Sequence, residues 1–395
     1  MKQKILALAA LAAVPLVMTL GNSMLIPVIP IIERTLNLTP VQASLIITVY
    51  SIAAVPLIPI AGFMSDRFGR KVVIIPSLML AGLGGLIAGL ASLFLSNPYR
   101  VILAARIMQG IGAAGAFPLT LPLTRDIFHD EAEVSHALGV IETSNTFGKV
   151  ISPILGAYLA ALSWYAPFAA IPLLAAASIL AIIFWIKTPQ QEQKVSEFQQ
   201  SISQLKTILL SEGRWLVTVY LTGCIIMLVL FGIQFYVSEY LEQNYHILGT
   251  RKGLVLAIPL AGLCTASYIA GRLLGDSKPL LKWTAFSGMA VLALSSGVIS
   301  FSRSLVLLIF ILTLGFSGIG AALPSLDALI TENIAKEQNG TVTSFYNSMR
   351  FVGVAVGPPI FAWLMRFSHQ LVFWTAAGFS LIAVILIGKF IKTDG

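Results

Sequence analysis

The chain has 395 residues, of which 57% are hydrophobic and 11% are charged, and its mean hydropathy is +0.89. Soluble proteins carry about a quarter charged residues, so this composition excludes a soluble enzyme or binding module. The net charge of +8 does not indicate a nucleic-acid-binding protein, because the basic residues occur in small groups between apolar segments. The two cysteines and four histidines lack metal-binding or redox spacing, and no ATPase-type phosphate loop is present. No cofactor or metal ion is therefore expected.

Twelve apolar segments are long enough, at about twenty residues, to cross a bilayer as helices. The first is too long for the apolar region of a signal peptide and contains Asn22, Pro27 and Pro30, so we expect a first transmembrane helix that the prolines bend. With both termini in the cytoplasm, sixteen basic residues lie inside and six outside, which favours an even number of spans. The segments cover about 5–31, 41–63, 72–95, 99–124, 134–160, 165–187, 215–239, 251–273, 279–301, 304–329, 340–366 and 370–391.

One polar segment divides these spans into two sets of six. We expect an N-terminal six-helix bundle over 1–187, a cytoplasmic linker over 188–213 and a C-terminal six-helix bundle over 214–395. The apolar residues of the linker recur at helical spacing, which predicts an amphipathic surface helix, and a solvated linker is the alternative. Those residues are Ile202, Leu205, Ile208 and Leu209.

Two short sequence repeats support this division. The segment Gly-Ile-Gly-Ala-Ala at 110–114 recurs at 318–322, in spans 4 and 10. The pattern Gly-x-x-x-small-Pro at 148–153 recurs at 353–358, in spans 5 and 11. Both repeats pair a span with the sixth span after it, as in transporters built from two related halves.

The densest cluster of charge in the first hundred residues lies at 62–71, between two apolar segments. Its basic residues predict a cytoplasmic loop, and its glycines permit a tight reversal. The pattern resembles the loop between helices 2 and 3 of the major facilitator superfamily of secondary transporters. The resemblance covers essentially the whole chain and implies an all-α membrane protein with twelve transmembrane helices in two pseudo-symmetric six-helix bundles. The matching residues are Gly62, Asp66, Arg67, Gly69, Arg70 and Lys71.

Arg106 lies inside the fourth span, within a stretch that resembles the superfamily's helix 4 motif. The resemblance implies that this arginine faces the central cavity and takes part in proton transfer. A guanidinium inside a span costs about 2.5–3.5 kcal/mol on insertion scales, so it needs water or a partner. The alternative is that Arg106 bonds to carbonyls of a neighbouring helix. The other matching residues are Leu103, Gln109, Gly110, Gly112, Ala113 and Ala114.

The fifth span resembles the helix 5 motif of antiporters and exporters through Gly148, Pro153 and Gly156. Ser152 and Ala157 stand where glycines are usual in that motif. Both replacements are small, so close helix packing is still expected. The direction of transport rests on this imperfect match.

Glu142 and Lys149 lie seven residues apart in the fifth span, on one face of the helix. Glu142 is the carboxylate that we place well inside a span. A carboxylate withdrawn from water can exchange a proton near neutral pH. We hypothesise that Glu142 carries the proton and that Arg106 and Lys149 bias its titration. A structural pair without titration is the alternative.

Further polar and aromatic side chains are expected to line a substrate cavity. By the repeat, Arg350 takes the position of Asn145 in the other half, where it would bind an anionic group or satisfy Asp327 or a carbonyl. Asn22 stands in helix 1, where many drug/proton antiporters have an acidic residue. The expected cavity residues are Asn22, Gln109, Asn145, Gln234, Tyr236, Tyr346 and Arg350.

A charge relay at the cytoplasmic end is implied by the same resemblance. Arg125 and Asp126 lie at the inner end of the fourth span and are expected to pair with the loop that contains Asp66. The expected residues of this cytoplasmic gate are Gly62, Asp66, Arg67, Gly69, Arg70, Arg125 and Asp126.

The resemblance implies a bacterial drug/proton antiporter of the inner cell membrane, which exports small amphipathic molecules in exchange for protons. We expect a monomer whose partners are its cargo, protons and the lipid bilayer. One alternative is a dedicated exporter of a single metabolite such as a siderophore or a sugar, and another is a lipid transporter of the same fold. A membrane enzyme would need a nucleophile with a base, or a metal cluster, and the sequence indicates neither.

Overall fold

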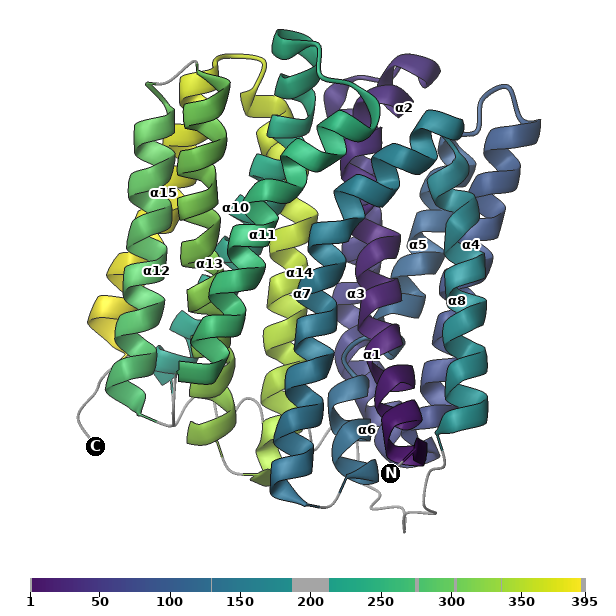
Figure 1. Cartoon of the computed structure of the whole chain (residues 1–395), viewed down its shortest axis with the longest axis vertical. Helices are drawn as coiled ribbons and strands as arrows, with labels where there is room; N and C mark the ends of the chain where they lie inside the picture. The colour runs from purple at the N-terminus through teal and green to yellow at the C-terminus, as the bar shows by residue number, and fades with distance from the viewer. Residues whose placement is uncertain are drawn as a thin grey trace. The chain divides into compact units, whose positions relative to one another are not determined.

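A computed structural model describes residues 2–128, 130–186, 213–273, 277–301, 304–334 and 336–391, and all regular structure within these ranges is helical (Figure 1). The helices up to residue 186 are α1 (Lys2–Ser23), the 3₁₀-helix η1 (Ile26–Val28), α2 (Ile29–Leu36), α3 (Pro40–Phe68), α4 (Arg70–Phe94), α5 (Tyr99–Ala116), α6 (Thr120–Ile127), α7 (Glu131–Leu162) and α8 (Ala166–Trp185). The later helices are α10 (Gly213–Tyr245), α11 (Gly249–Leu273), α12 (Lys278–Ile299), α13 (Leu305–Asn333), α14 (Lys336–Leu364) and α15 (His369–Phe390).

Packing between helices divides the chain into two compact units. Unit 1 comprises Met1–Phe198 with Leu248–Gly253, and unit 2 comprises Gln199–Ile247 with Leu254–Gly395. In unit 1, α1 packs on α7 and α8, α3 on α5, and α4 on α5 and α8. In unit 2, α10 packs on α14 and α15, and α12 packs on α13 and α15. The predicted linker helix lies outside the described residues, apart from Gly213, at which α10 begins.

Ten helical segments in the described ranges are long and apolar enough to cross a membrane. The two further long helices are α7, with 32 residues, and α14, with 29 residues. Both carry polar side chains along their length, including Glu142, Asn145 and Lys149 in α7 and Asn347 and Arg350 in α14. They are the fifth and eleventh of the predicted spans, so the most polar spans occupy corresponding places in the two halves.

The first span is interrupted, although its sequence predicted one bent helix over 5–31. Helix α1 ends at Ser23, η1 contains Pro27, and α2 begins at Ile29 with Pro30 in its first turn. Proline lacks an N–H and fixes its own φ, which suits it to the first turn of a helix, and Pro27 and Pro30 each stand in the first turn of a new helical segment, whereas Pro15 lies inside α1. The prolines therefore divide the segment as well as bend it.

Helix α3 has well-defined ends. At its start the Thr39 side chain accepts a hydrogen bond from the Gln42 backbone N–H, and the Gln42 side chain accepts one from the Thr39 N–H. At its end Gly69 adopts a φ of 95°, a conformation that favours glycine. The reversal at Gly69 directs the chain into α4 and places the basic residues of the loop at one end of unit 1.

Small residues let the fifth and eleventh spans approach their neighbours closely, and they do so at equivalent places. Gly148 of α7 faces Thr19 of α1, and Gly353 of α14 faces Cys224 of α10. The two offsets agree, since 353 − 148 = 205 and 224 − 19 = 205. A side chain at Gly353 would collide with the Cys224 carbonyl oxygen. The second sequence repeat therefore corresponds to a repeated helix contact.

The other sequence repeat does not correspond to one contact. Gly110 of α5 packs on the carbonyl of Tyr50 in α3, whereas Gly318 of α13 packs on the carbonyl of Gly288 in α12. Because α3 and α12 are the second and ninth spans, these glycines face non-equivalent neighbours. The repeated sequence therefore reflects that both spans need small residues for close helix packing, and the two copies make different contacts.

Candidate functional site

Arg106 of α5 is fully buried, and its hydrogen bonds go to neutral acceptors. Nε donates to the Ile46 carbonyl (2.8 Å), and Nη1 donates to the Gly21 carbonyl (3.1 Å) and to Gln109 Oε1 (2.6 Å). Nη2 donates to Asn22 Oδ1 (2.5 Å). The guanidinium carbon also lies 4.4 Å from the centroid of the Tyr50 ring. Of the two arrangements expected from the sequence, Arg106 adopts the one that satisfies carbonyls of neighbouring helices.

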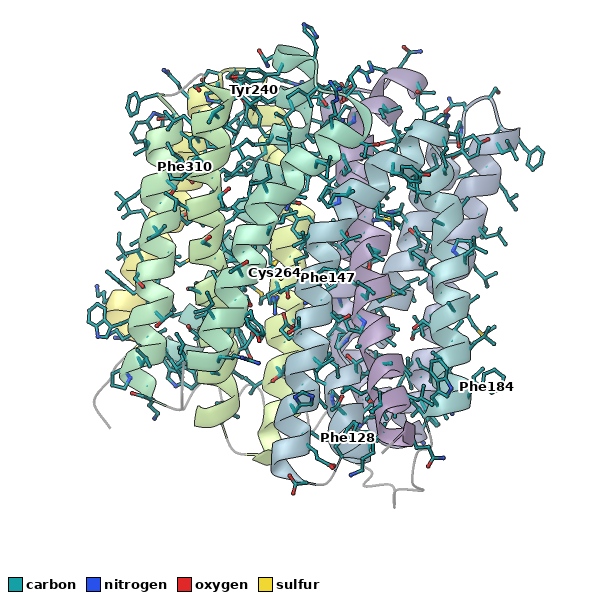
Figure 2. The ribbon with its side chains drawn as sticks, viewed as in Figure 1. Phe128, Phe147, Phe184, Tyr240, Cys264 and Phe310 are labelled. Atoms are coloured by element: carbon teal, nitrogen blue, oxygen red, sulfur yellow. The ribbon has the colours of Figure 1, made fainter. Side chains whose placement is uncertain are left out.

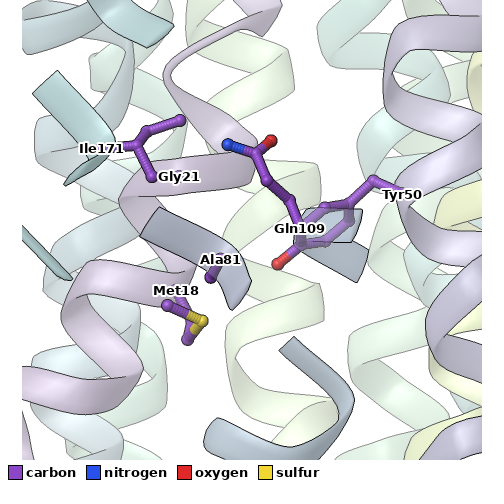
Figure 3. A pocket seen from close by; sticks show the side chains of 6 residues that line it. All are labelled: Met18, Gly21, Tyr50, Ala81, Gln109 and Ile171. Atoms are coloured by element: carbon purple, nitrogen blue, oxygen red, sulfur yellow. The ribbon is translucent and has the colours of Figure 1, made fainter. Parts of the chain in front are cut away.

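Gln109 links this cluster to a small cavity inside unit 1 (Figure 3). Because Arg106 donates to Oε1, Nε2 must point elsewhere, and none of the described residues accepts a hydrogen bond from it. The Gln109 residue is 2% exposed, so this donor is buried. The cavity has room for about one water molecule and is lined by Met18, Gly21, Tyr50, Ala81, Gln109 and Ile171.

Asn145 of α7 is the centre of a second polar cluster. Thr19 Oγ1 of α1 donates to Asn145 Oδ1 (2.6 Å), and Asn145 Nδ2 donates to the Glu142 carboxylate (3.1 Å). Glu142 is half-buried, whereas Lys149, two turns further along α7, is 8% exposed. A hydrogen-bonded chain thus runs from α1 to the carboxylate that we expect to carry the proton.

The three residues of the proton-coupling hypothesis lie in different surroundings. The partners of the Arg106 guanidinium include neither Glu142 nor Lys149. Helix α1 contacts both clusters, through Asn22 on the Arg106 side and Thr19 on the Asn145 side. Arg106 and Glu142 therefore share a neighbour, α1, but no direct hydrogen bond.

The loop between α3 and α4 holds an ion-pair cluster. Arg70 Nε donates to Asp126 Oδ2 of α6 (2.6 Å), and Arg70 Nη1 lies 3.5 Å from Asp66 Oδ1. Lys71 Nζ donates to the carbonyls of Ile183 (3.3 Å) and Ile186 (2.7 Å) at the end of α8. Asp126 thus meets the loop as expected, with Arg70 and not Asp66 as its partner.

The remaining residues of the expected gate are less involved in this cluster. Arg67 and Arg125 are exposed, and neither forms an ion pair with a described residue. The Arg67 guanidinium lies 5.4 Å from the ring of the adjacent Phe68. Gly62 accepts a hydrogen bond from Ser65 through its carbonyl. Arg125 was expected to pair with the loop, and the structure places its side chain in solvent instead.

Arg350 of α14 has an acidic partner, unlike Arg106. Its Nη1 lies 3.7 Å from Asp327 Oδ1 of α13, and its guanidinium carbon lies 5.6 Å from the Tyr346 ring. Tyr346 packs beside Tyr220, whose hydroxyl donates to the Val342 carbonyl (2.9 Å). Of the roles considered for Arg350, pairing with Asp327 is present in this structure.

Tyr236 of α10 belongs to an aromatic cluster at one end of unit 2. Its hydroxyl lies 2.6 Å from Nδ1 of His369, the first residue of α15. Its ring stacks on Tyr240, which Figure 2 labels, and meets Phe373 edge to face. Tyr236 thus joins α10 to α15. Gln234, two residues earlier, is 9% exposed.

Two buried carboxylates beside this cluster were not expected from the sequence. Glu239 and Glu242 are 7% and 4% exposed, and Glu239 accepts a hydrogen bond from Gln243 Nε2 (2.6 Å). The seventh span was expected to end at 239, whereas α10 continues to Tyr245. The signal that would have extended it is the apolar and aromatic spacing of Tyr236, Tyr240 and Leu241.

Comparison with known proteins assigns the family. The Major Facilitator Superfamily model matches residues 11–358 and 237–395. The structure is similar to the D-xylose-proton symporter, with a TM-score of 0.77 over 98% of each chain at 16% identity. It is also similar to a human organic anion transporter, with a TM-score of 0.75 over 97% of this chain and 99% of that one at 18% identity. The chain belongs to the Major Facilitator Superfamily and is a multi-pass membrane transporter.

Relatives of known function differ widely in their identity to this chain. The Bacillibactin exporter of Bacillus subtilis strain 168 is 50% identical over 96% of this chain and 94% of its own length. Multidrug resistance protein 2 of the same strain is 26% identical over 86% and 84% of the two chains. The quinolone resistance protein NorA of Staphylococcus aureus is 24% identical over 93% and 92%.

Proposed function

We propose that this protein exports a siderophore across the bacterial cell membrane by proton-coupled alternating access. The observation that carries the proposal is the 50% identity, over nearly the full length of both chains, to an exporter of bacillibactin. The relatives named for drug resistance have about half that identity. Of the functions expected from the sequence, the dedicated metabolite exporter is therefore favoured over the multidrug antiporter.

The proposed mechanism uses units 1 and 2 as the N-terminal and C-terminal bundles, joined by the linker over 188–213. Asp126 and Arg70 would form the ion pair that holds the predicted cytoplasmic end in one state. Such pairs suit a switch, because two alternating states must differ by only a few kcal/mol. Arg106 would keep α1, α3 and α5 together as one rigid group while the state changes.

A complementation experiment tests the cargo. The protein is expressed in a Bacillus subtilis strain that lacks its Bacillibactin exporter, and bacillibactin in the medium is measured by mass spectrometry under iron limitation. We expect secretion to be restored relative to the empty vector, with equal membrane amounts confirmed by immunoblot. If secretion stays at the vector level while resistance to a quinolone rises, the multidrug function replaces the one proposed.

A second experiment tests proton coupling through Glu142. Proton release from purified protein is measured when bacillibactin is added, for the wild type and for Glu142→Gln. We expect release from the wild type and none from the variant. Glu133→Gln is the matched control, because Glu133 lies on the same helix in an exposed ion pair with Lys4 (2.6 Å). If Glu142→Gln releases protons normally, the carrier is another group, and Glu239→Gln is the next variant to measure.

A further inference from the structure

Helix α12 begins with two lysines on one face that no acidic residue in the described ranges neutralises. Lys278 is exposed, whereas Lys282, four residues later, is 8% exposed. Neither forms a hydrogen bond or ion pair with a described residue. The Lys282 ammonium lies 5.3 Å from the centroid of the adjacent Trp283 ring. A buried stem whose ammonium has no described acidic partner can accept an anionic ligand.

The electrostatics of this helix start are unfavourable in three ways. Like charges four residues apart repel each other. The first turn of a helix carries partial positive charge, which disfavours cations. No acidic residue occurs in α12, and on α13 the described side chain of Asp327 pairs with Arg350. All three effects would be relieved by one bound anion.

Helix α15 adds a third cation near the start of α12. Gly388 of α15 approaches the Phe286 ring of α12, so the end of α15 lies next to the start of α12. Lys389 is exposed there, 5.5 Å from the ring of Phe390. The described part of α15 contains no acidic residue. We call Lys278, Lys282, Trp283 and Lys389 the basic start of α12.

In unit 1, the positive charges at a corresponding helix start have partners within the protein. Helix α4 also begins with two cations, Arg70 and Lys71. Arg70 is paired with Asp126 and Asp66, and Lys71 donates to carbonyls at the end of α8. Helices α4 and α12 are the third and ninth predicted spans and therefore correspond in the two halves. Described acidic residues and carbonyls neutralise the start of α4, whereas no described acidic residue pairs with the start of α12.

The surface around the lysines is apolar as well as basic. Trp283 is 55% exposed and Leu280 is 46% exposed, and Trp283 meets Phe286 edge to face at 5.2 Å. Exposed tryptophan next to lysine is typical of the membrane–water boundary. The distribution of basic residues predicts this end to be cytoplasmic, where anionic lipids attract lysines. A free phosphate ion would use the cations but not the apolar surface.

We propose that the basic start of α12 binds the headgroup of an anionic phospholipid. The phosphate lies between Lys278 and Lys282, Lys389 adds positive charge, and the acyl chains lie along Trp283 and Leu280. This inference concerns a lipid site outside the transport function proposed above and does not depend on the cargo or on proton coupling.

Lipid titration of the purified full-length protein tests this site. Protein in a neutral detergent is titrated with dioleoylphosphatidylglycerol or dioleoylphosphatidylcholine, and binding is followed by native mass spectrometry and by thermal unfolding. We expect phosphatidylglycerol to bind more tightly and to raise the unfolding temperature more. Lys282→Gln should weaken phosphatidylglycerol binding about fivefold, which corresponds to about 1 kcal/mol per cation near an anionic membrane. The preference should shrink in high salt.

Two controls make the test decisive. Arg100→Gln removes one exposed cation from a helix start in unit 1 and should leave lipid binding unchanged. Lys278→Gln alters an exposed residue, so it should fold even if Lys282→Gln does not, and it should also weaken binding. Equal losses in Arg100→Gln and Lys278→Gln would overturn the proposal, because they indicate non-specific charge attraction. Stabilisation by inorganic phosphate as large as by the lipid would overturn it in favour of a soluble anion.

Discussion

The two units of this transporter each contain an inward-placed arginine, and they hold it in opposite ways. In unit 1, Arg106 is fully buried and makes four hydrogen bonds to neutral acceptors on three helices. In unit 2, the side chain of Arg350 is 12% exposed and faces an acid, Asp327, at 3.7 Å, which is longer than a hydrogen bond. The first arrangement holds a cation by neutral acceptors, and the second places a cation opposite an acid.

The two units share helix contacts but differ in their charged and polar side chains. The units repeat the close contacts of α7 with α1 and of α14 with α10, at Gly148 and Gly353. They do not repeat the charges, since Asn145 corresponds to Arg350 and the neutralised start of α4 corresponds to the basic start of α12. Helix geometry has thus been kept in both halves, while each half has its own polar groups.

The largest effect is expected at the buried arginine. A lysine at position 106 offers three donors and cannot serve four acceptors arranged around a planar guanidinium. Each buried acceptor left without a donor costs about 1–3 kcal/mol, so Arg106→Lys should lower the free energy of unfolding by about 2–4 kcal/mol. Thermal and denaturant unfolding of the purified protein measures this loss.

Arg350→Lys is the matched control in unit 2. A lysine at position 350 keeps the positive charge that faces Asp327 at 3.7 Å, so this substitution should cost less than Arg106→Lys does. Equal losses at the two positions would contradict the distinction between an arginine held by neutral acceptors and one that faces an acid.

A smaller effect is expected at the paired glycines. A Cβ at Gly353 would collide with the backbone oxygen of Cys224, which cannot move without separating α14 from α10. Gly353→Ala should therefore cost about 1–3 kcal/mol, as overpacking does. Urea- or detergent-induced unfolding measures the change.

Gly148→Ala is the comparison in unit 1. The atoms nearest to its Cβ would be side-chain atoms of Leu16 and Thr19, at 3.2 and 3.3 Å, which can shift slightly. Alanine also favours the helix by about 0.5–1 kcal/mol over glycine. The substitution should be nearly neutral, and a loss as large as that of Gly353→Ala would show that close packing matters equally in both units.

The long apolar segments made the fold predictable. The sixth span, expected over 165–187, is α8 at Ala166–Trp185, because the segment is apolar throughout and Lys187 follows it directly. The second span was expected to end at 63 and continues to Phe68, since Asp66 and Arg67 extend the helix beyond its apolar part. Helix ends that depend on polar residues were the least predictable.

The sequence predicted which residues belong to the candidate site, but not which groups they bond to. The cost of a charge inside a span singled out Arg106 correctly as a buried group that needs partners. Two of those partners are the carbonyls of Ile46 and Gly21. Every residue has a backbone carbonyl, so a sequence does not indicate which carbonyls accept a hydrogen bond. The lack of an acidic partner for Lys282 within the described residues was equally hidden, because it depends on how the helices pack.

The smallest change in stability is expected at the two aspartates that face Arg70. Asp126 accepts a 2.6 Å hydrogen bond with its side chain 14% exposed, whereas Asp66 lies 3.5 Å away with its side chain 53% exposed. Charged hydrogen bonds are worth about 1.5–3 kcal/mol when shielded, and exposed ion pairs about 0.2–1 kcal/mol. Asp126→Asn should therefore lower stability more than Asp66→Asn does.

Salt dependence sharpens this last comparison, because exposed pairs are screened more than shielded ones. Unfolding is measured for both variants at low and high ionic strength. The loss in Asp66→Asn should vanish in high salt, while most of the loss in Asp126→Asn should remain. If Asp66→Asn is instead the more harmful and its loss survives high salt, Asp66 has a stronger partner in another state of the transporter. The ion pair of Arg70 would then exchange between the two aspartates during transport.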